Sequence, residues 1–169
     1  RHSITNMSHL HFVSAQPYAQ RVLQLGEAPE SVFNVGAPGL ESITNTNLLT
    51  RKSLEEALKF SFGHINFLIT YHSVTLQSAH AEKAIQSLLD ALNSFPEAHM
   101  IFTKQNSDTE GHVIGEKIDE YTQVHSSNTK SFFSLGQLHY FSALNEVDIV
   151  IGNSSSGIIE APAFKKATV

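Results

Sequence analysis

The residues best suited to chemistry lie where an apolar stretch, residues 149–151, ends in the small polar run GNSSSG. In that run Ser154 and Ser155 carry hydroxyl donors, and their small size lets a phosphate approach the backbone. If a helix begins here, its first backbone amides and its partial positive end also favour an anion. Glu160 follows about one turn later, and its carboxylate, which only accepts hydrogen bonds, suits ribose or sugar hydroxyls. The spacing predicts an anion site beside a hydroxyl-binding carboxylate.

The same run has a simpler interpretation, in which Ser154 or Ser155 caps the helix and Glu160 complements its dipole. The residues alone leave both interpretations open. The chain has no G-x-x-x-x-G-K-[ST] and no G-x-G-x-x-G motif, so neither an ATPase P-loop nor a dinucleotide fingerprint is indicated. It also lacks G-x-S-x-G, and no base for a serine nucleophile is visible near the run.

A second candidate is His72, in the run ITYHSVT, which follows the most hydrophobic stretch of the chain. A histidine there can donate to a phosphate or transfer a proton near neutral pH. The alternative is a capping or surface histidine, because the chain has ten histidines and any one of them is weak evidence. The others show no pairing that indicates a metal site, so we expect none.

These candidates need a scaffold, and the apolar pattern predicts repeated strand–helix units. Strands are predicted over residues 65–71, 99–102, 130–133, 148–151 and from 167 onward, with helices over 80–92, 113–121, 137–144 and 156–163. Strands that are apolar throughout and separated by helices are typical of a parallel sheet covered on both faces. We therefore predict an α/β, Rossmann-like fold. Its ligands bind beyond the carboxyl ends of the strands, where His72 and the serine run fall.

The first quarter of the chain departs from this repeat. Strands over 9–13 and 31–35 flank a helix over 16–25, a turn is predicted at 36–39, and residues 44–47 form a polar connection. Ser53 and Glu56 match a capping box for a helix that ends near Phe60. We expect the α/β domain to cover residues 44–169, with 1–43 belonging to another domain and the connection to it. Because the chain opens without Met inside a structured segment, a fragment of a longer polypeptide is expected.

Composition narrows the class of protein. The chain has 169 residues, of which 41% are hydrophobic and 16% charged, and a formal net charge of −5. No global positive field is available for nucleic acid or an anionic membrane, so neither is an expected partner. The absence of cysteine excludes disulfides, thiolate nucleophiles and cysteine-bound zinc. No apolar run approaches a membrane span and no secretory signal opens the chain, so a cytoplasmic protein is expected.

Three segments, RHSIT with MSHLHF, then ITYHSVT, then GNSSSGIIEAPAF, occur in an order and spacing that resembles UDP-N-acetylglucosamine 2-epimerases. The resemblance covers essentially the whole chain, and the NSS-x-G-x-x-E block is its most specific part. Non-hydrolysing relatives typically carry an acidic-Ser-Gly-Gly turn and a His-Arg-Arg-Glu motif. Here Asn153 precedes the serines and Ser73-Val74 follow His72, which favours the hydrolysing branch of the sialic-acid and legionaminic-acid pathways.

The resemblance implies the GT-B arrangement, two Rossmann-like domains with UDP between them, of which this chain would be most of the C-terminal one. It implies that Ser154 and Ser155 hold the diphosphate and Glu160 the ribose hydroxyls. His72 would be catalytic, contacting the phosphate side and supporting the loss of UDP.

Two further positions are implied by the resemblance alone. Asn106 matches a position near the nucleotide, and Leu135 matches a loop whose backbone meets uracil, although an ordinary turn before a helix would explain Leu135 equally well. Carboxylates of the N-terminal domain, outside this chain, would supply most acids and bases. The roles of Arg1 and His2, at the edge of that region, stay open.

The implied reaction eliminates UDP to give a 2-acetamidoglucal and then adds water, with inversion at the second carbon, to release N-acetylmannosamine. No cofactor is implied, the fragment alone is expected to be inactive, and the full-length enzyme is expected to form a homodimer or a larger assembly. Three alternatives stay open: an epimerase acting on UDP-2,4-diacetamido-2,4,6-trideoxyglucose, a GT-B glycosyltransferase, and a non-catalytic UDP-sugar-binding module.

Overall fold

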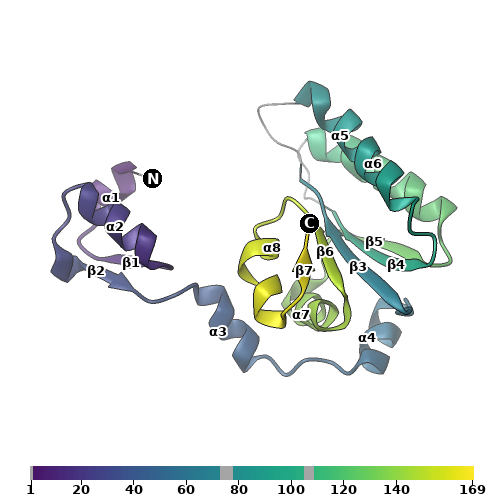
Figure 1. Ribbon diagram of the computed structural model, residues 1–169, viewed down its shortest axis with the longest axis horizontal. Helices are drawn as coiled ribbons and strands as arrows, with labels where there is room; N and C mark the ends of the chain where they lie inside the picture. The colour runs from purple at the N-terminus through teal and green to yellow at the C-terminus, as the bar shows by residue number, and fades with distance from the viewer. Residues whose placement is uncertain (1, 73–77, 105–108) are drawn as a thin grey trace. The chain divides into compact units, whose positions relative to one another are not determined.

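The computed structural model describes residues 2–72, 78–104 and 109–169. The chain forms two units, Arg1–Thr46 and Asn47–Val169, which are coloured from purple to yellow along the chain in Figure 1. Each unit is described by itself below.

The second unit is built on a five-stranded parallel sheet. Its strands are β3 (Ile65–Thr70), β4 (Ala98–Thr103), β5 (Thr129–Phe132), β6 (Ile149–Gly152) and β7 (Ala167–Thr168). They lie in the order β5-β4-β3-β6-β7, and each neighbouring pair is parallel. The direction of chain progression reverses between β3 and β6, so the carboxyl ends of these two strands form a switch point, where ligands of open sheets bind.

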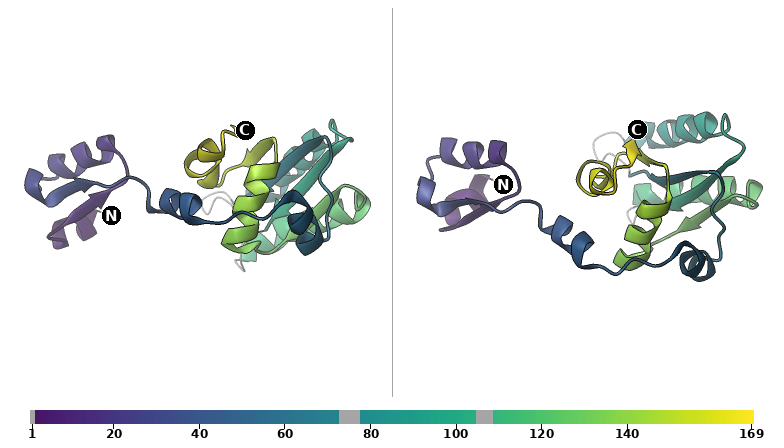
Figure 2. Two further views of the ribbon diagram at one scale, coloured as in Figure 1. Left: turned by 90° about the horizontal axis from the view of Figure 1, so that it is seen from below. Right: turned by 60° about the horizontal axis from the view of Figure 1, so that its bottom comes forward.

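Helices cover both faces of this sheet (Figures 1 and 2). On one face lie α5 (Ser78–Leu92) and α6 (Thr109–Val124), and on the other α7 (Gly136–Glu146), which packs against α4 (Arg51–Leu58). A short helix, α8 (Ser156–Ile159), and a 3₁₀ turn, η2 (Ala161–Phe164), follow β6 and lead to β7. The predicted fold class, a parallel α/β sheet with helices on both faces, is confirmed.

The core explains why the central strands β3 and β4 are mostly apolar. Phe67, Ile69 and Phe102 pack with residues of α5 and α6 such as Leu89 and Ile118, all of them buried. Successive strand residues point to opposite faces, and the intervening Leu68 and Ile101 are fully buried as well. Burial on both faces therefore requires a continuous apolar run in each central strand.

The predicted capping box at Ser53 is wrong, because α4 begins three residues earlier than that cap would place it. Thr50 is the N-cap residue, and its side chain accepts a hydrogen bond from the Ser53 backbone N–H at 3.3 Å. Ser53 is the third helical residue, whose amide has no partner inside the helix and needs a cap.

Two other expectations are corrected. A helix, α3 (Pro38–Asn45), begins within the predicted turn and ends within the predicted polar connection. Pro38 occupies its first position, where a fixed φ suits a helix and no N–H is needed. The single helix predicted over 156–163 is divided into α8 and η2, with Glu160 at the junction and Pro162 in the turn.

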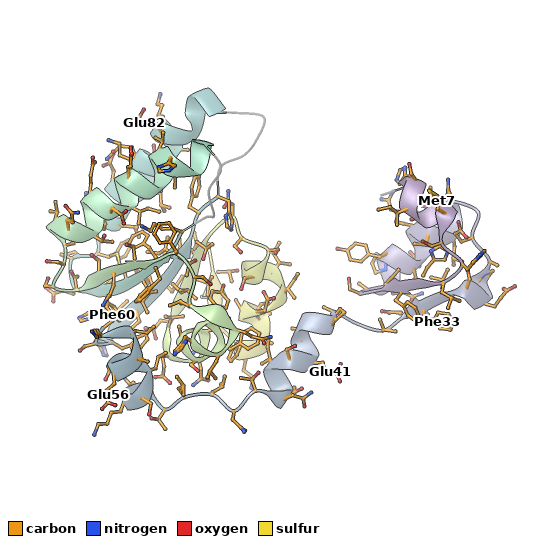
Figure 3. The ribbon with its side chains drawn as sticks, turned by 180° about the vertical axis from the view of Figure 1, so that it is seen from behind. Met7, Phe33, Glu41, Glu56, Phe60 and Glu82 are labelled. Atoms are coloured by element: carbon orange, nitrogen blue, oxygen red, sulfur yellow. The ribbon has the colours of Figure 1, made fainter. Side chains whose placement is uncertain are left out.

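The first unit is small. It pairs β1 (His11–Val13) with β2 (Val32–Asn34) in parallel, with α2 (Gln16–Gln24) and a 3₁₀ turn, η1 (Pro29–Ser31), between them and α1 (His2–Met7) before them. Both predicted strands and the helix between them are confirmed. Phe33, labelled in Figure 3, stacks on Phe12 with ring centroids 5.5 Å apart. His11 is buried, with Nε2 3.0 Å from the Glu27 carboxylate. None of the helices described in either unit is long and apolar enough to cross a membrane.

Candidate functional site

A cavity of about 410 Å³ opens at the carboxyl ends of β3 and β4, beside the turn that follows β6. It lies within the second unit. Its walls come from the ends of the two strands, the loop before α7, the first turn of that helix, and the β6–α8 turn. The lining residues are Thr70, Thr103, Phe133, Ser134, Leu135, Gly136, Gln137, Tyr140, Phe141, Ser154, Ser155, Ser156 and Glu160.

The strand ends supply two buried hydroxyls. Thr70 and Thr103 are paired in the β3–β4 register, and their Oγ1 atoms are 2.5 Å apart. In the same cavity, the Tyr140 hydroxyl donates to Ser156 Oγ at 2.6 Å. These hydroxyls line the cavity and are hydrogen-bonded to one another. Their orientation is therefore fixed before any ligand binds.

The turn between β6 and α8, residues 153–155, is called the serine turn here, and it supplies hydrogen-bond donors. Ser154 Oγ accepts from the Ser156 backbone N–H at 3.3 Å, and the Ser155 side chain makes no capping hydrogen bond to α8. In the described part of the chain, no group accepts a hydrogen bond from the backbone amides of Ser154 and Ser155. A plain capping role therefore accounts for the Ser154 hydroxyl and leaves the Ser155 hydroxyl and both amides for another partner.

Glu160 lines the same cavity from the far end of α8. It is the C-cap residue of that helix, where a carboxylate is disfavoured by the helix dipole, so it does not complement the helix N-terminus. Among the described residues, none donates a hydrogen bond to its carboxylate or pairs with it. An acceptor-only group in this position suits hydroxyl donors of a ligand.

Tyr140 is held neutral by its surroundings. Burial is the largest cause and raises the pKa of its phenol above the usual value; the hydrogen bond to Ser156 lowers it in part, the Glu160 carboxylate raises it further, and a hydrogen bond with Thr70 lowers it. At neutral pH the phenol is therefore a donor next to the cavity.

A raised phenol pKa makes the alkaline stability of the chain depend on Tyr140. The unfolded chain loses this proton first, so the free energy of unfolding falls as the pH rises from about 10 through the folded pKa, and is unaffected below that range. We expect Tyr140→Phe to flatten this alkaline fall. Urea unfolding at several pH values measures it, and identical curves for the variant and the wild type would contradict the assignment.

Leu135 is the N-cap residue of α7, and its buried side chain lines the cavity. Its carbonyl accepts a hydrogen bond from His139 Nδ1 at 3.0 Å. The next residue, Gly136, has φ +65°, a conformation that favours glycine and turns the chain sharply into the helix. The loop is therefore fixed where it enters α7, beside the cavity.

The structure thus brings together four of the predicted residues, Ser154, Ser155, Glu160 and Leu135. His72 is half-buried and does not line the cavity, but its backbone is bonded to the side chain of Asn153, next to the serines. Asn106 lies outside the described residues.

Sequence reasoning did not single out Thr70, Thr103 or Tyr140, which complete the cavity. Two of them could have been found, because Thr70 and Thr103 are polar residues at the ends of apolar strands. In open α/β sheets, ligands bind beyond these carboxyl ends. Within the described residues, no three histidine, aspartate or glutamate side chains gather as metal ligands would.

Comparison with known proteins adds the family. The family model described as UDP-N-acetylglucosamine 2-epimerase matches residues 1–169. The chain is 46% identical, over 98% of its length, to the GDP/UDP-N,N'-diacetylbacillosamine 2-epimerase (hydrolyzing) of Campylobacter jejuni. It is 35% identical, over 97% of its length, to the UDP-N,N'-diacetylbacillosamine 2-epimerase (hydrolyzing) of Legionella pneumophila. The chain spans about 43% of the length of these curated relatives.

Solved structures share the fold. The chain matches the S. aureus MnaA–UDP co-structure with a TM-score of 0.73 at 14% identity, covering 98% of this chain and 42% of that one. It matches the UDP-GlcNAc 2-epimerase of Neisseria meningitidis bound to UDP-GlcNAc with the same TM-score at 16% identity, covering 98% of this chain and 45% of that one. At these identities the likeness concerns the fold, and it confirms the predicted fold, a Rossmann-like half of the GT-B arrangement. The chain belongs to the UDP-N-acetylglucosamine 2-epimerase family.

Proposed function

We propose that this chain supplies the UDP-binding domain of a hydrolysing UDP-sugar 2-epimerase. The observation that carries the proposal is the cavity at the carboxyl edge of the sheet, whose walls include Ser154, Ser155 and Glu160. Its polar lining and its place near a switch point suit a nucleotide diphosphate. Membership of the family supports the same reading.

In this proposal the Ser155 hydroxyl and the backbone amides of Ser154 and Ser155 donate to the diphosphate. Glu160 accepts hydrogen bonds from the ribose hydroxyls, and the loop at Leu135 meets the uracil. The neutral Tyr140 phenol keeps its proton on Ser156 and so holds that wall of the cavity in place. Asn106 is proposed to lie near the nucleotide on the strength of the resemblance alone.

The reaction would begin with cleavage of the bond between the anomeric carbon and UDP, which leaves with the bonding electrons, while a base removes the proton from the second carbon. Water then adds to the glycal at the anomeric carbon, and the second carbon is protonated from the opposite face. His72 would stabilise the departing diphosphate, and carboxylates of the other domain would transfer the protons. A fragment without that domain would bind UDP weakly and not turn over.

The domain assignment is part of the proposal. We infer that residues 1–43 end a preceding domain and connect it to the UDP-binding domain over 44–169, which agrees with the separation of the chain into units near residue 46. A homodimeric or larger assembly and a cytoplasmic location are further predictions, as is the absence of a cofactor.

For the sugar we propose UDP-N-acetylglucosamine, which gives N-acetylmannosamine and UDP. A relative in Escherichia coli, 37% identical, is named polysialic acid biosynthesis protein P7, which supports a sialic-acid pathway. The second candidate is UDP-2,4-diacetamido-2,4,6-trideoxyglucose. The 46% and 35% identities to relatives named for UDP-N,N'-diacetylbacillosamine, which is this sugar nucleotide, favour it.

Product analysis of the full-length enzyme with each UDP-sugar separates these possibilities. Release of UDP with free N-acetylmannosamine supports the first sugar, and release with the free diacetamido sugar supports the second. UDP release that requires an added acceptor would indicate a glycosyltransferase. Binding of both UDP-sugars without any release would indicate a non-catalytic module.

The site assignment predicts the effect of two substitutions on UDP binding. We expect Ser155→Ala and Glu160→Ala each to raise the dissociation constant of UDP for the full-length enzyme by about 10- to 100-fold, because each removes a hydrogen bond to a charged or buried group. Calorimetry measures the change. Ser94→Ala and Glu56→Ala, on exposed positions elsewhere in the unit, are matched controls. If both site variants bind UDP as tightly as the wild type, the turn at Ser154 and Ser155 only caps the helix and does not bind the diphosphate.

A further inference from the structure

The side chain of Asn153 makes two hydrogen bonds to the backbone of one residue, His72. The His72 N–H donates to Asn153 Oδ1 at 2.8 Å, and Asn153 Nδ2 donates to the His72 carbonyl at 2.8 Å. The partners are a backbone donor and a backbone acceptor, so only one orientation of the amide satisfies both. The side chain thus behaves like a peptide group placed beside His72.

This contact extends the sheet past the ends of its strands. Backbone pairing between β3 and β6, which lie side by side in Figure 1, ends at Thr70 and Gly152. His72 lies two residues beyond that point and Asn153 one residue beyond it. The Asn153 amide therefore replaces the strand partner that the His72 backbone would otherwise lack.

The geometry has a consequence for the imidazole. Fixing both the N–H and the carbonyl of His72 restrains its φ and ψ, and with them the direction of its Cα–Cβ bond. Asn153 is directly followed by Ser154 and Ser155, so a single side chain ties the histidine to the serine turn. The distance from the imidazole to a ligand bound at Ser154 and Ser155 therefore depends on the two Asn153 hydrogen bonds.

We propose that Asn153 is a positioning residue, which sets the approach of the His72 imidazole to the diphosphate. The inference rests on the proposed function. Only asparagine combines a donor and an acceptor at this side-chain length. Aspartate has no donor and would bring a carboxylate oxygen against the His72 carbonyl, glutamine is one methylene longer, and alanine has neither group.

A second asparagine provides a matched control for lost stability. Nδ2 of Asn128 donates to the backbone carbonyls of Pro96 and Ala98 at 3.0 and 2.8 Å, at the amino end of β4 and β5. Asn128→Ala therefore also removes two side-chain hydrogen bonds to backbone. These bonds lie at the opposite end of the sheet from the cavity. The variant therefore measures the loss of stability from two such bonds without a change at the site.

The test uses the full-length enzyme, with the UDP-sugar that it converts, and four variants: Asn153→Ala, Asn128→Ala, His72→Ala, and the Asn153/His72 double variant. We expect Asn153→Ala to lower kcat by about 10- to 100-fold, the effect of a misplaced catalytic group. Its KM and its UDP dissociation constant are expected to match those of Asn128→Ala, whose kcat is unchanged. In the His72→Ala background, Asn153→Ala should have no further effect on kcat, because it acts through His72.

Each other outcome overturns a defined part of the proposal. If Asn153→Ala keeps the kcat of Asn128→Ala, the positioning role is wrong and the proposed function stands. If the loss is equally large in the His72→Ala background, Asn153 does not act through His72. If His72→Ala keeps full kcat, the role of His72 fails together with that of Asn153. A wild-type enzyme that releases UDP from neither sugar overturns the proposed function itself.

Discussion

Replacing Gly152 by alanine is expected to lower the free energy of unfolding by about 3 to 5 kcal/mol. Gly152 ends β6 with φ +129°, a conformation that side chains rarely adopt. A Cβ at this position would lie 1.9 Å from the carbonyl oxygen of Thr70 and 2.8 Å from its carbonyl carbon. Both atoms belong to the backbone of β3, so no side-chain movement relieves the contact.

The loss is large because the two strands cannot separate cheaply at this point. Thr70 and Gly152 are a paired position in the β3–β6 register, and β3 is the central strand of the sheet. Moving either backbone by the required distance disrupts that pairing and displaces Asn153 and the serine turn that follow. Urea denaturation followed by circular dichroism measures the change in the free energy of unfolding.

Gly115→Ala is the matched control. Gly115 lies inside α6, and among the described residues an added Cβ would meet only the Lys104 side chain, at 4.0 Å. We expect this substitution to raise the free energy of unfolding by about 0.5 to 1 kcal/mol, because alanine favours a helix interior over glycine. The same chemical change should therefore have opposite signs at the two positions. If Gly152→Ala lowers the free energy of unfolding no more than a surface substitution does, the backbones of β3 and β6 do not approach each other as closely at Thr70 and Gly152 as described.

The sheet could be predicted from the sequence because burial on both faces leaves a local signal. In β3 every residue after Ile65 is buried, so the strand appears in the sequence as a nearly continuous apolar run that ends shortly before His72. The same signal located β4 and β6, and it placed the serine run and His72 at one edge of the sheet. Composition and periodicity are sufficient for this because they reflect each strand separately.

The wrong predictions concern where helices begin and end. At each of these places the local sequence is compatible with more than one structure. Thr50 and Ser53 are both good N-cap residues, and the sequence does not show that α4 extends back to Arg51. The proline at position 38 is compatible with the predicted turn, but the first position of a helix suits proline equally well. Pro162 likewise lies in a 3₁₀ turn rather than in a continuous helix.

The remaining part of the site depends on pairs far apart in the chain. Thr70 and Thr103 meet because β3 and β4 pair in one particular register, and Tyr140 reaches Ser156 because α7 packs beside the β6–α8 turn. The bridge from Asn153 to His72 joins residues 81 positions apart. No pattern in a single sequence specifies such registers, so these contacts became visible only in the folded chain.

The second large effect is expected at Phe102, the residue before Thr103 in β4. Phe102 is fully buried in the core between the sheet and α6, with its ring 5.8 Å from that of Tyr121 in an edge-on arrangement. Phe102→Ala leaves a cavity that rigid neighbours on both sides cannot fill, and we expect the free energy of unfolding to fall by about 3 to 5 kcal/mol. Urea denaturation measures it, and Phe102→Leu, which keeps most of the volume, should lose clearly less.

Adjacent positions in β4 should separate packing from binding, because successive side chains point to opposite faces. Phe102 faces the core and lines no part of the cavity, whereas Thr103 lines it. The folded Phe102→Leu variant of the full-length enzyme is therefore expected to bind UDP as the wild type does. If Phe102→Leu weakened UDP binding as strongly as Ser155→Ala, the cavity would depend on the core packing beneath it, and the rigid scaffold on which the site assignment rests would be the wrong description.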